Sequence, residues 1–138
     1  MGLRFDSSPE GGIQAEGRCG ASVSHARGWV ACVVVSSGRP GIDIEPMIDR
    51  DFDKLGEWAF GAGGSREEFY ERWTRYEARI KAYGDGEPRA SHVERTWFIA
   101  GRVAVSVCVP ARQGARKIGR IAFGRWNNTT KSGVTYRF

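Results

Sequence analysis

The feature that most constrains the fold is an apolar run at residues 29–35, which is rich in β-branched side chains. A short run of this kind that ends in Ser36-Ser37-Gly38-Arg39-Pro40 is typical of a buried strand followed by a turn. With 138 residues, of which 41% are hydrophobic and 27% charged, the chain has the make-up of a globular protein and not of a disordered or fibrous one. Its length predicts one domain that buries a core without disulfides or metal.

A second strand is expected directly after this turn. Residues 41–45 read Gly-Ile-Asp-Ile-Glu, so apolar and acidic side chains alternate. Because successive side chains of a strand point to opposite faces, Ile42 and Ile44 are predicted on one face and Asp43 and Glu45 on the other.

Two helices are predicted in the middle of the chain. The first is short, carries Phe52, Leu55 and Ala59 on one side, and ends at the glycine-rich segment 61–64. The second has stronger signals. Ser65 can cap its N-terminus with Glu68 three residues on, the capping-box pattern, and Gly84 closes it. Between these ends four apolar side chains recur at helical spacing: Phe69, Trp73, Tyr76 and Ile80.

Strands return in the second half of the chain. Residues 96–109 predict a hairpin that turns near Ala100-Gly101, with Val103, Val105, Val107 and Val109 along one face of its second strand. Beyond Pro110 the pattern weakens to short strands at 121–123 and 134–138. Strands around two helices indicate an α+β domain. We expect a loosely structured lead-in at 1–22, the domain at 23–110 and a basic tail at 111–138.

The charge is distributed unevenly. The net charge is +5, yet the tail alone holds seven cations and no acid: Arg112, Arg116, Lys117, Arg120, Arg125, Lys131 and Arg137. The body is therefore mildly acidic, and the basicity of the tail needs its own explanation. A solvated end is one alternative, and an electrostatic binding segment is the other.

The cysteines and the hydropathy pattern suggest a compartment. The three cysteines, Cys19, Cys32 and Cys108, form no Cys-x-x-Cys pair, and an odd number suits a reducing environment. The longest uncharged run, at residues 28–37, has about half the length that a membrane-spanning helix requires. We therefore expect a cytoplasmic protein with no membrane partner, membrane span or signal peptide.

Three acidic residues form a candidate cation site. Asp43 and Glu45 project from one face of a strand, roughly 7 Å apart at the backbone. Magnesium binds a few carboxylate oxygens and commonly shares its remaining positions between water and substrate phosphates. Glu77 is the candidate third acid, on a helix face that also carries Trp73 and Lys81. The alternative is an exposed acidic strand and an ordinary surface pair between Glu77 and Lys81.

Three motifs together resemble a family. The chain contains, in this order, Ser24-His25, Gly41-Ile42-Asp43-Ile44-Glu45 and Trp73-Thr74-x-x-Glu77-Ala78-x-x-Lys81-Ala82. In their order and separation these motifs resemble the signature of the 4′-phosphopantetheinyl transferases. The resemblance covers about residues 20–110. It implies a single lobe in which an antiparallel sheet packs against helices. It also implies magnesium-dependent transfer of the phosphopantetheine arm of coenzyme A to a serine of an acyl or peptidyl carrier protein, with release of adenosine 3′,5′-bisphosphate.

The resemblance assigns a role to each matching residue. Asp43, Glu45 and Glu77 would hold the magnesium ion that binds the pyrophosphate of coenzyme A. Glu77 would also act as general base for the carrier serine, and Lys81 would stabilise the leaving group near the phosphates. Ser24 and His25 would contact the 3′-phosphate or nearby phosphate oxygens. The resemblance also implies a role in fatty acid or polyketide biosynthesis.

The chain departs from the family pattern in two ways. Tyr76 stands where the family usually has a lysine, immediately before the helix glutamate. The motifs are those of two-lobed members, yet only about 23 residues precede Ser24, a length similar to that of the single-lobe members. Because those members share active sites between subunits, we expect a homo-oligomer in which a second copy completes the cleft.

Two other functions remain open. One is a member of the family that binds coenzyme A or a carrier protein without transferring the arm. The other is a nucleic-acid-binding module that uses the tail, although the acidic body gives this hypothesis little support. If the protein is a transferase, the basic tail would replace missing phosphate contacts or attract an acidic carrier protein.

Overall fold

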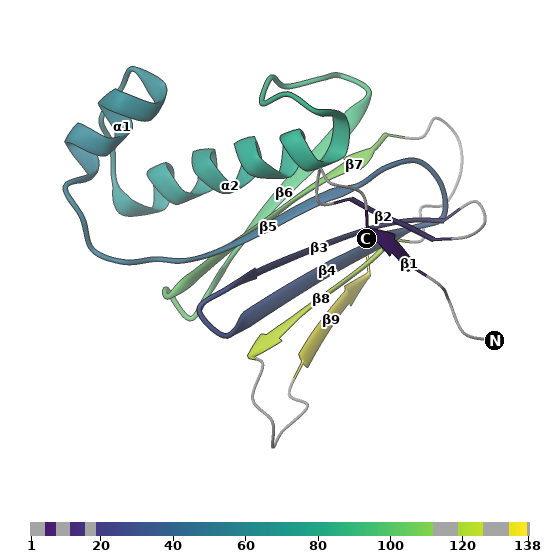
Figure 1. The fold of residues 1–138 in the computed structure, drawn as a ribbon. Helices are drawn as coiled ribbons and strands as arrows, with labels where there is room; N and C mark the ends of the chain where they lie inside the picture. Colours follow the sequence, from purple (N-terminus) through teal and green to yellow (C-terminus); the bar gives the residue numbers. More distant parts are fainter. Residues whose placement is uncertain (1–4, 8–11, 16–18, 112–118, 126–132, 138) are drawn as a thin grey trace.

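The computed structural model describes residues 5–7, 12–15, 19–111, 119–125 and 133–137. They form an α+β arrangement of two antiparallel sheets and two helices (Figure 1). The elements in chain order are β1 (Phe5–Ser7), β2 (Gly12–Ala15), β3 (Gly20–Ala26), β4 (Trp29–Val35), β5 (Gly41–Pro46), α1 (Phe52–Phe60), α2 (Arg66–Tyr83), β6 (His92–Ile99), β7 (Val103–Pro110), β8 (Gly119–Arg125) and β9 (Gly133–Arg137).

The larger sheet draws its strands from both ends of the chain. Its order is β1-β2-β3-β4-β8-β9, and every neighbouring pair is antiparallel. The N-terminal residues, expected to be loosely structured, thus contribute β1 and β2 beside β3. The segment 111–138, expected to be a tail with two short strands, contributes β8 along the whole of β4 and then β9. The larger sheet therefore includes strands from both sides of residues 23–110.

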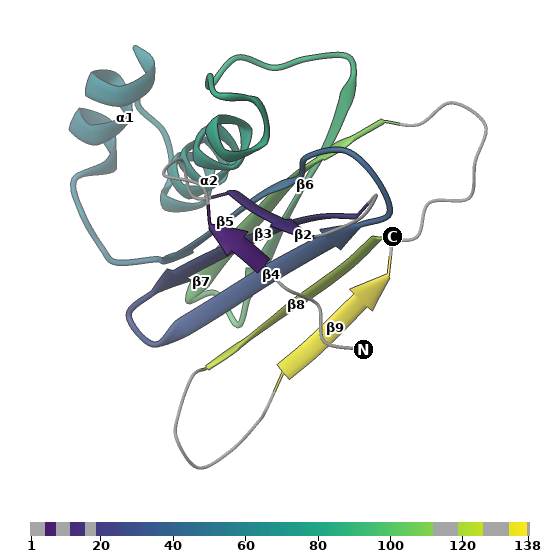
Figure 2. The same cartoon turned by 45° about the vertical axis from the view of Figure 1, so that its right-hand side comes forward.

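The smaller sheet has the order β5-β7-β6 and lies between the larger sheet and α2 (Figure 2). The predicted hairpin is confirmed as β6 and β7, which turn at Ala100 and Gly101, two residues with positive φ. The predicted valine face of β7 is confirmed as well. Its side chains join those of β4 and β5 in the main core: Ala31, Val33, Val35, Ile42, Ile44, Val103, Val105, Val107 and Val109.

The opposite face of β7 packs against α2. Ala104 lies against Tyr70 and Met47, and Cys108 lies against Ala78 and Ala82 of the helix. Every residue of β7 from 103 to 109 is buried, because one face of this strand meets the larger sheet and the other meets the helix.

Both predicted helices are confirmed, together with their ends. Asp51 caps α1, and Gly61 closes it in the left-handed conformation that glycine adopts without steric cost. Ser65 and Glu68 form the predicted capping box of α2, and Gly84 closes that helix in the same way. Within the part of the chain that the structure describes, no helix has both the length and the apolar character needed to cross a membrane.

Candidate functional site

A buried hydrogen-bonded triad lies where the last turn of α2 packs on β5, which in turn packs on β3 of the larger sheet. It consists of Ser24 from β3, Asp43 from β5 and Lys81 from the last turn of α2, and we call it the Asp43 triad. The Lys81 Nζ atom lies 2.8 Å from Asp43 Oδ1 and 3.1 Å from Ser24 Oγ, and the Ser24 hydroxyl donates to Asp43 Oδ1 at 3.0 Å. Asp43 is only 5% exposed and Ser24 7%. The hypothesis of an exposed acidic strand with an ordinary surface pair is therefore wrong for Asp43.

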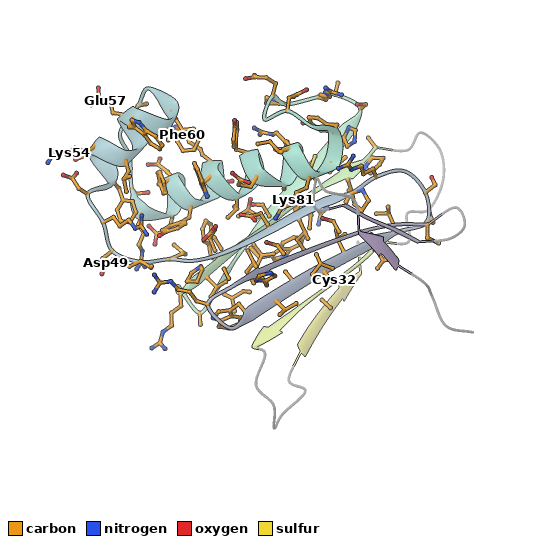
Figure 3. All side chains as sticks on the ribbon, viewed as in Figure 1. Cys32, Asp49, Lys54, Glu57, Phe60 and Lys81 are labelled. Carbon is orange, nitrogen blue, oxygen red and sulfur yellow. The ribbon has the colours of Figure 1, made fainter. Side chains whose placement is uncertain are left out.

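The backbone of β5 completes the triad. The Ile44 N–H donates to Ser24 Oγ at 3.3 Å, and Lys81 Nζ donates to the Ile42 carbonyl oxygen at 3.0 Å. Figure 3 shows Lys81 extending from α2 toward the strands below the helix. The triad therefore joins three elements that are far apart in sequence.

Strand alternation explains which side chains reach the triad. Ser22 and Ser24 are two residues apart on β3, both are buried, and both bond to β5, since the Ile42 N–H donates to Ser22 Oγ at 3.2 Å. His25 lies between Ala26 and Ser24 in the chain, so its side chain points to the opposite face of β3, where it is exposed. The structure thus brings Ser24 to the predicted site and leaves His25 outside it.

Glu45 and Glu77 lie within electrostatic reach of the triad. Burial raises the pKa of Asp43 above its usual range, and the Lys81 charge counteracts this. Burial also raises the pKa of Glu45, and the charges of Asp43 and Glu77 raise it further. The pKa of Glu77 is raised as well, first by burial and then by the charge of Asp43. The three predicted carboxylates therefore share one region, in which like charges disfavour ionisation.

The donors in this region suit a hard cation in type, although they are not gathered into a finished site. In the described residues, no group of three or more His, Cys, Asp or Glu side chains lies close enough to hold a metal ion. Asp43 Oδ2 is buried and lacks a hydrogen-bond partner, whereas Oδ1 is occupied by the triad. A buried carboxylate oxygen without a partner is costly, and a divalent cation would satisfy it. The carboxylates therefore supply oxygen atoms of the type that magnesium prefers, but in this arrangement they do not form a group that could hold the ion.

A cavity of about 420 Å³ has Glu45 in its wall, whereas Asp43 and Glu77 do not line it. Glu45 lies in its wall next to Trp73, whose side chain bonds to Glu45 and lowers the pKa of that carboxyl relative to burial alone. The full lining combines aromatic and apolar side chains with two arginines: Ala26, Arg27, Glu45, Pro46, Ile48, Arg50, Leu55, Trp58, Phe69, Tyr70 and Trp73. The cavity can therefore take a ligand that has an apolar part and an anionic part.

Tyr76, the residue at the family's lysine position, lies elsewhere. It lines a second cavity of about 580 Å³ with Arg72, Arg75 and Arg79. Its ring stacks on that of Trp73 with a centroid distance of 6.3 Å, and the backbone of Gly86 lies against its edge. Tyr76 therefore lines the second cavity and not the first, and it is not a member of the Asp43 triad.

Several residues of this region were not foreseen from the sequence. Arg27 follows the β3 strand and Arg50 precedes α1, and neither stands in a recognisable motif. Ser22 carried a usable signal, because two serines spaced two apart in a strand share a face. The Ile42 carbonyl had no signal, since any residue supplies a carbonyl oxygen.

Comparison with known proteins gives no relative: no protein-family model, curated protein or solved structure matches this chain.

Proposed function

We propose that this protein transfers the 4′-phosphopantetheine arm of coenzyme A to a serine of an acyl or peptidyl carrier protein, with magnesium as cofactor. The observation that carries the proposal is the Asp43 triad with Glu45 and Glu77 beside it. These residues come from the three segments that resemble the transferase signature, and the fold brings the three segments together. The α+β arrangement of an antiparallel sheet under a helix agrees with a single lobe of that family.

Asp43, Glu45 and Glu77 are the residues that would hold the cation. Burial first, and then repulsion from neighbouring carboxylates, raises the pKa values of Glu45 and Glu77, and a cation at this position would offset both effects. A bound magnesium ion would supply Lewis-acid stabilisation of charge on the pyrophosphate.

Glu77 is the proposed general base. It would accept the proton of the carrier serine as the serine oxygen bonds to the β-phosphorus and the bond from that phosphorus to the bridging oxygen breaks. Its raised pKa brings it closer to neutral pH and makes it a better proton acceptor than an ordinary surface carboxylate. The released product is adenosine 3′,5′-bisphosphate.

The cavity beside Glu45 supports binding of the substrates next to these groups. Its two arginines suit phosphate or carboxylate oxygens, and its aromatic walls suit an uncharged chain. A second copy of the chain would complete the cleft, so we expect a homo-oligomer, which light scattering after gel filtration measures directly.

The test is the intact mass of a panel of apo carrier proteins after incubation with the protein, coenzyme A and magnesium. We expect a mass increase of one phosphopantetheine with the wild-type chain and a loss of the increase with Glu77→Gln. Glu67→Gln is the matched control, because Glu67 lies on the same helix, is exposed and pairs with Arg66. No increase for any carrier, or equal loss in both variants, contradicts the proposal.

A second candidate is a member that binds coenzyme A or a carrier protein without transfer. It is favoured by the position of Tyr76, which offers no proton donor or cation to the triad where the family has lysine. Calorimetry with coenzyme A separates the two candidates, since binding without any mass increase on carriers would support the second.

A further inference from the structure

The smaller sheet has an open edge at β6. Among the strands that end a sheet in the described part of the chain, β6 is the longest, with eight residues against three in β1, five in β9 and six in β5. Its pairing with β7 runs without a bulge, and the strand contains neither proline nor lysine. Short length, bulges, proline and lysine commonly protect an edge strand from pairing with another chain, and β6 has none of these protections.

The other edge of the smaller sheet is closed by side chains. On β5 the Ile42 N–H donates to Ser22 Oγ at 3.2 Å, and the Ile44 N–H donates to Ser24 Oγ at 3.3 Å. These two N–H groups of β5 therefore have their partners on β3 of the larger sheet. Among the described residues, by contrast, β6 has no strand beside it other than β7. The backbone groups of β6 that point away from β7 can therefore pair with a further strand.

Apolar side chains are left uncovered at the β6 edge. Val93 is 37% exposed and Phe98 41%, whereas Trp97 and Ile99 are partly buried where they pack against the main core. Val93, Trp97 and Ile99 share one face of β6, and this face continues the valine face of β7. Because β6 packs mainly against β7 and α2, and less against the larger sheet, the main core stays open at this edge.

Two copies of β6 complement each other when they pair antiparallel about a twofold axis at Thr96. Each residue then faces the one that lies equally far from the axis on the other strand. Val93 faces Ile99 of the second copy, and Arg95 faces Trp97 of the second copy. An apolar pair and an arginine beside an indole ring both stabilise neighbouring strands, and no like charges face each other. With the axis at Arg95, two arginines would face each other, which is unfavourable.

We propose that β6 is an interface for a second copy of this chain, formed by antiparallel pairing of the two β6 strands about Thr96. The pairing joins the smaller sheets of the two copies into one continuous sheet and covers the open end of each main core. The proposal does not rest on the transfer reaction, since β6 lies at the opposite edge of the sheet from β5, the strand that carries Asp43 and Glu45. It is therefore a different contact from the one that would complete the cleft.

The first experiment is sedimentation equilibrium of the full chain over a wide range of concentrations. We expect a reversible dimer, and we expect Val93→Lys to raise its dissociation constant about ten-fold, because an ammonium group replaces an apolar one at two equivalent positions. Val34→Lys is the matched control: Val34 is 39% exposed, but its strand β4 already has β3 and β8 on its two sides. A monomer at every concentration, an unweakened Val93→Lys dimer or equal weakening in both variants would overturn the proposal.

The register has its own test. Arg95 is exposed, so Arg95→Gln leaves the fold intact. We expect this variant to weaken the dimer several-fold, because it removes the cation beside Trp97 of the second copy. An unchanged or tighter dimer would overturn the register about Thr96.

Hydrogen exchange of the wild-type chain gives a measurement that depends on no variant. Alternate amides of residues 92–99 should exchange more slowly at a concentration that favours the dimer than in dilute solution, because those N–H groups gain a partner strand. The amides of β4 should exchange equally in both samples, since this strand is paired on both sides. Exchange in β6 that does not depend on concentration would overturn the interface.

Discussion

Gly41 of β5 lies directly beneath the Ala78 carbonyl of α2. A Cβ atom added to Gly41 would sit 1.8 Å from that carbonyl oxygen and 2.8 Å from the backbone nitrogen of Ala82. The helix backbone therefore rests on the strand with no side chain between them. Lys81 stands one residue before Ala82, and Asp43 stands two residues after Gly41, so this close approach brings the two charged groups together.

Gly41→Ala should destabilise the protein by about 3 kcal/mol, because the methyl group forces α2 away from β5. Urea unfolding followed by circular dichroism measures the change. Gly61→Ala is the control: Gly61 has a φ of 69° and open space around its Cβ position, so this variant should lose only about 1 kcal/mol of backbone strain. Equal losses in the two variants would show that the helix does not rest on Gly41.

Stability should depend on pH through the carboxylates beside the triad. The pKa of Glu77 is raised in the folded state, which means that folding favours the protonated side chain. The contribution of Glu77 to the free energy of unfolding is therefore fully present below the ordinary glutamate pKa and is lost as pH rises through the raised value. Glu77→Gln should therefore match wild type near pH 4 and be the more stable protein near pH 7, in the absence of divalent cations. Urea unfolding at both pH values measures this difference.

Glu67→Gln serves as the control for this pH prediction, since Glu67 is exposed and lies outside the carboxylate region. The difference in the free energy of unfolding between Glu67→Gln and wild type should not shift in favour of the variant from pH 4 to pH 7. A Glu77→Gln chain that is less stable than wild type at pH 7 would contradict the assignment of repulsion to this region.

The contact between α2 and β7 contains a chain of hydroxyl groups. Ser106 Oγ lies 2.6 Å from Thr74 Oγ1 and 2.8 Å from Thr96 Oγ1, and the Arg75 Nε–H donates to Thr96 Oγ1. Ser106→Ala should cost about 1–2 kcal/mol, because it removes a partner from two hydroxyls, one of them buried. Ser36→Ala, at an exposed position, should change stability by less than about 0.5 kcal/mol in the same urea experiment. A Ser106 variant as stable as the Ser36 variant would contradict this role.

Tyr76→Lys should not improve transfer activity. The Tyr76 ring packs against Trp73 and Gly86, and a lysine there would lie among Arg72, Arg75 and Arg79 and not beside Asp43. We expect a loss of about 1 kcal/mol in the free energy of unfolding and no gain in the carrier-mass assay, whereas Tyr76→Phe keeps the ring and the stability. A large gain in rate with lysine would instead identify position 76 as part of the reaction site.

Local signals in the sequence were sufficient for most elements. The capping box at Ser65 and Glu68, the closing Gly84 and the valine alternation of β7 all act within a few residues of the chain. The alternation of residues 41–45 also placed Ile42 and Asp43 on opposite faces correctly, because side-chain direction in a strand follows from backbone geometry alone. The short strands β1 and β2 lacked such a signal. They are strands because β2 pairs with the edge of β3 and β1 pairs with β2, and these partners lie outside each strand's own sequence.

The candidate site, too, was predictable from the local sequence only in part. By itself the sequence determined which residues carry charge and that Asp43 and Glu45 share a strand face. Only the tertiary structure decided that Lys81 and Ser24 bond to Asp43, and that the face of β3 that carries Ser24 is buried while the face that carries His25 is exposed. The physical reason is that these contacts depend on how closely α2, β3 and β5 pack, and that distance is set by the small residues between them.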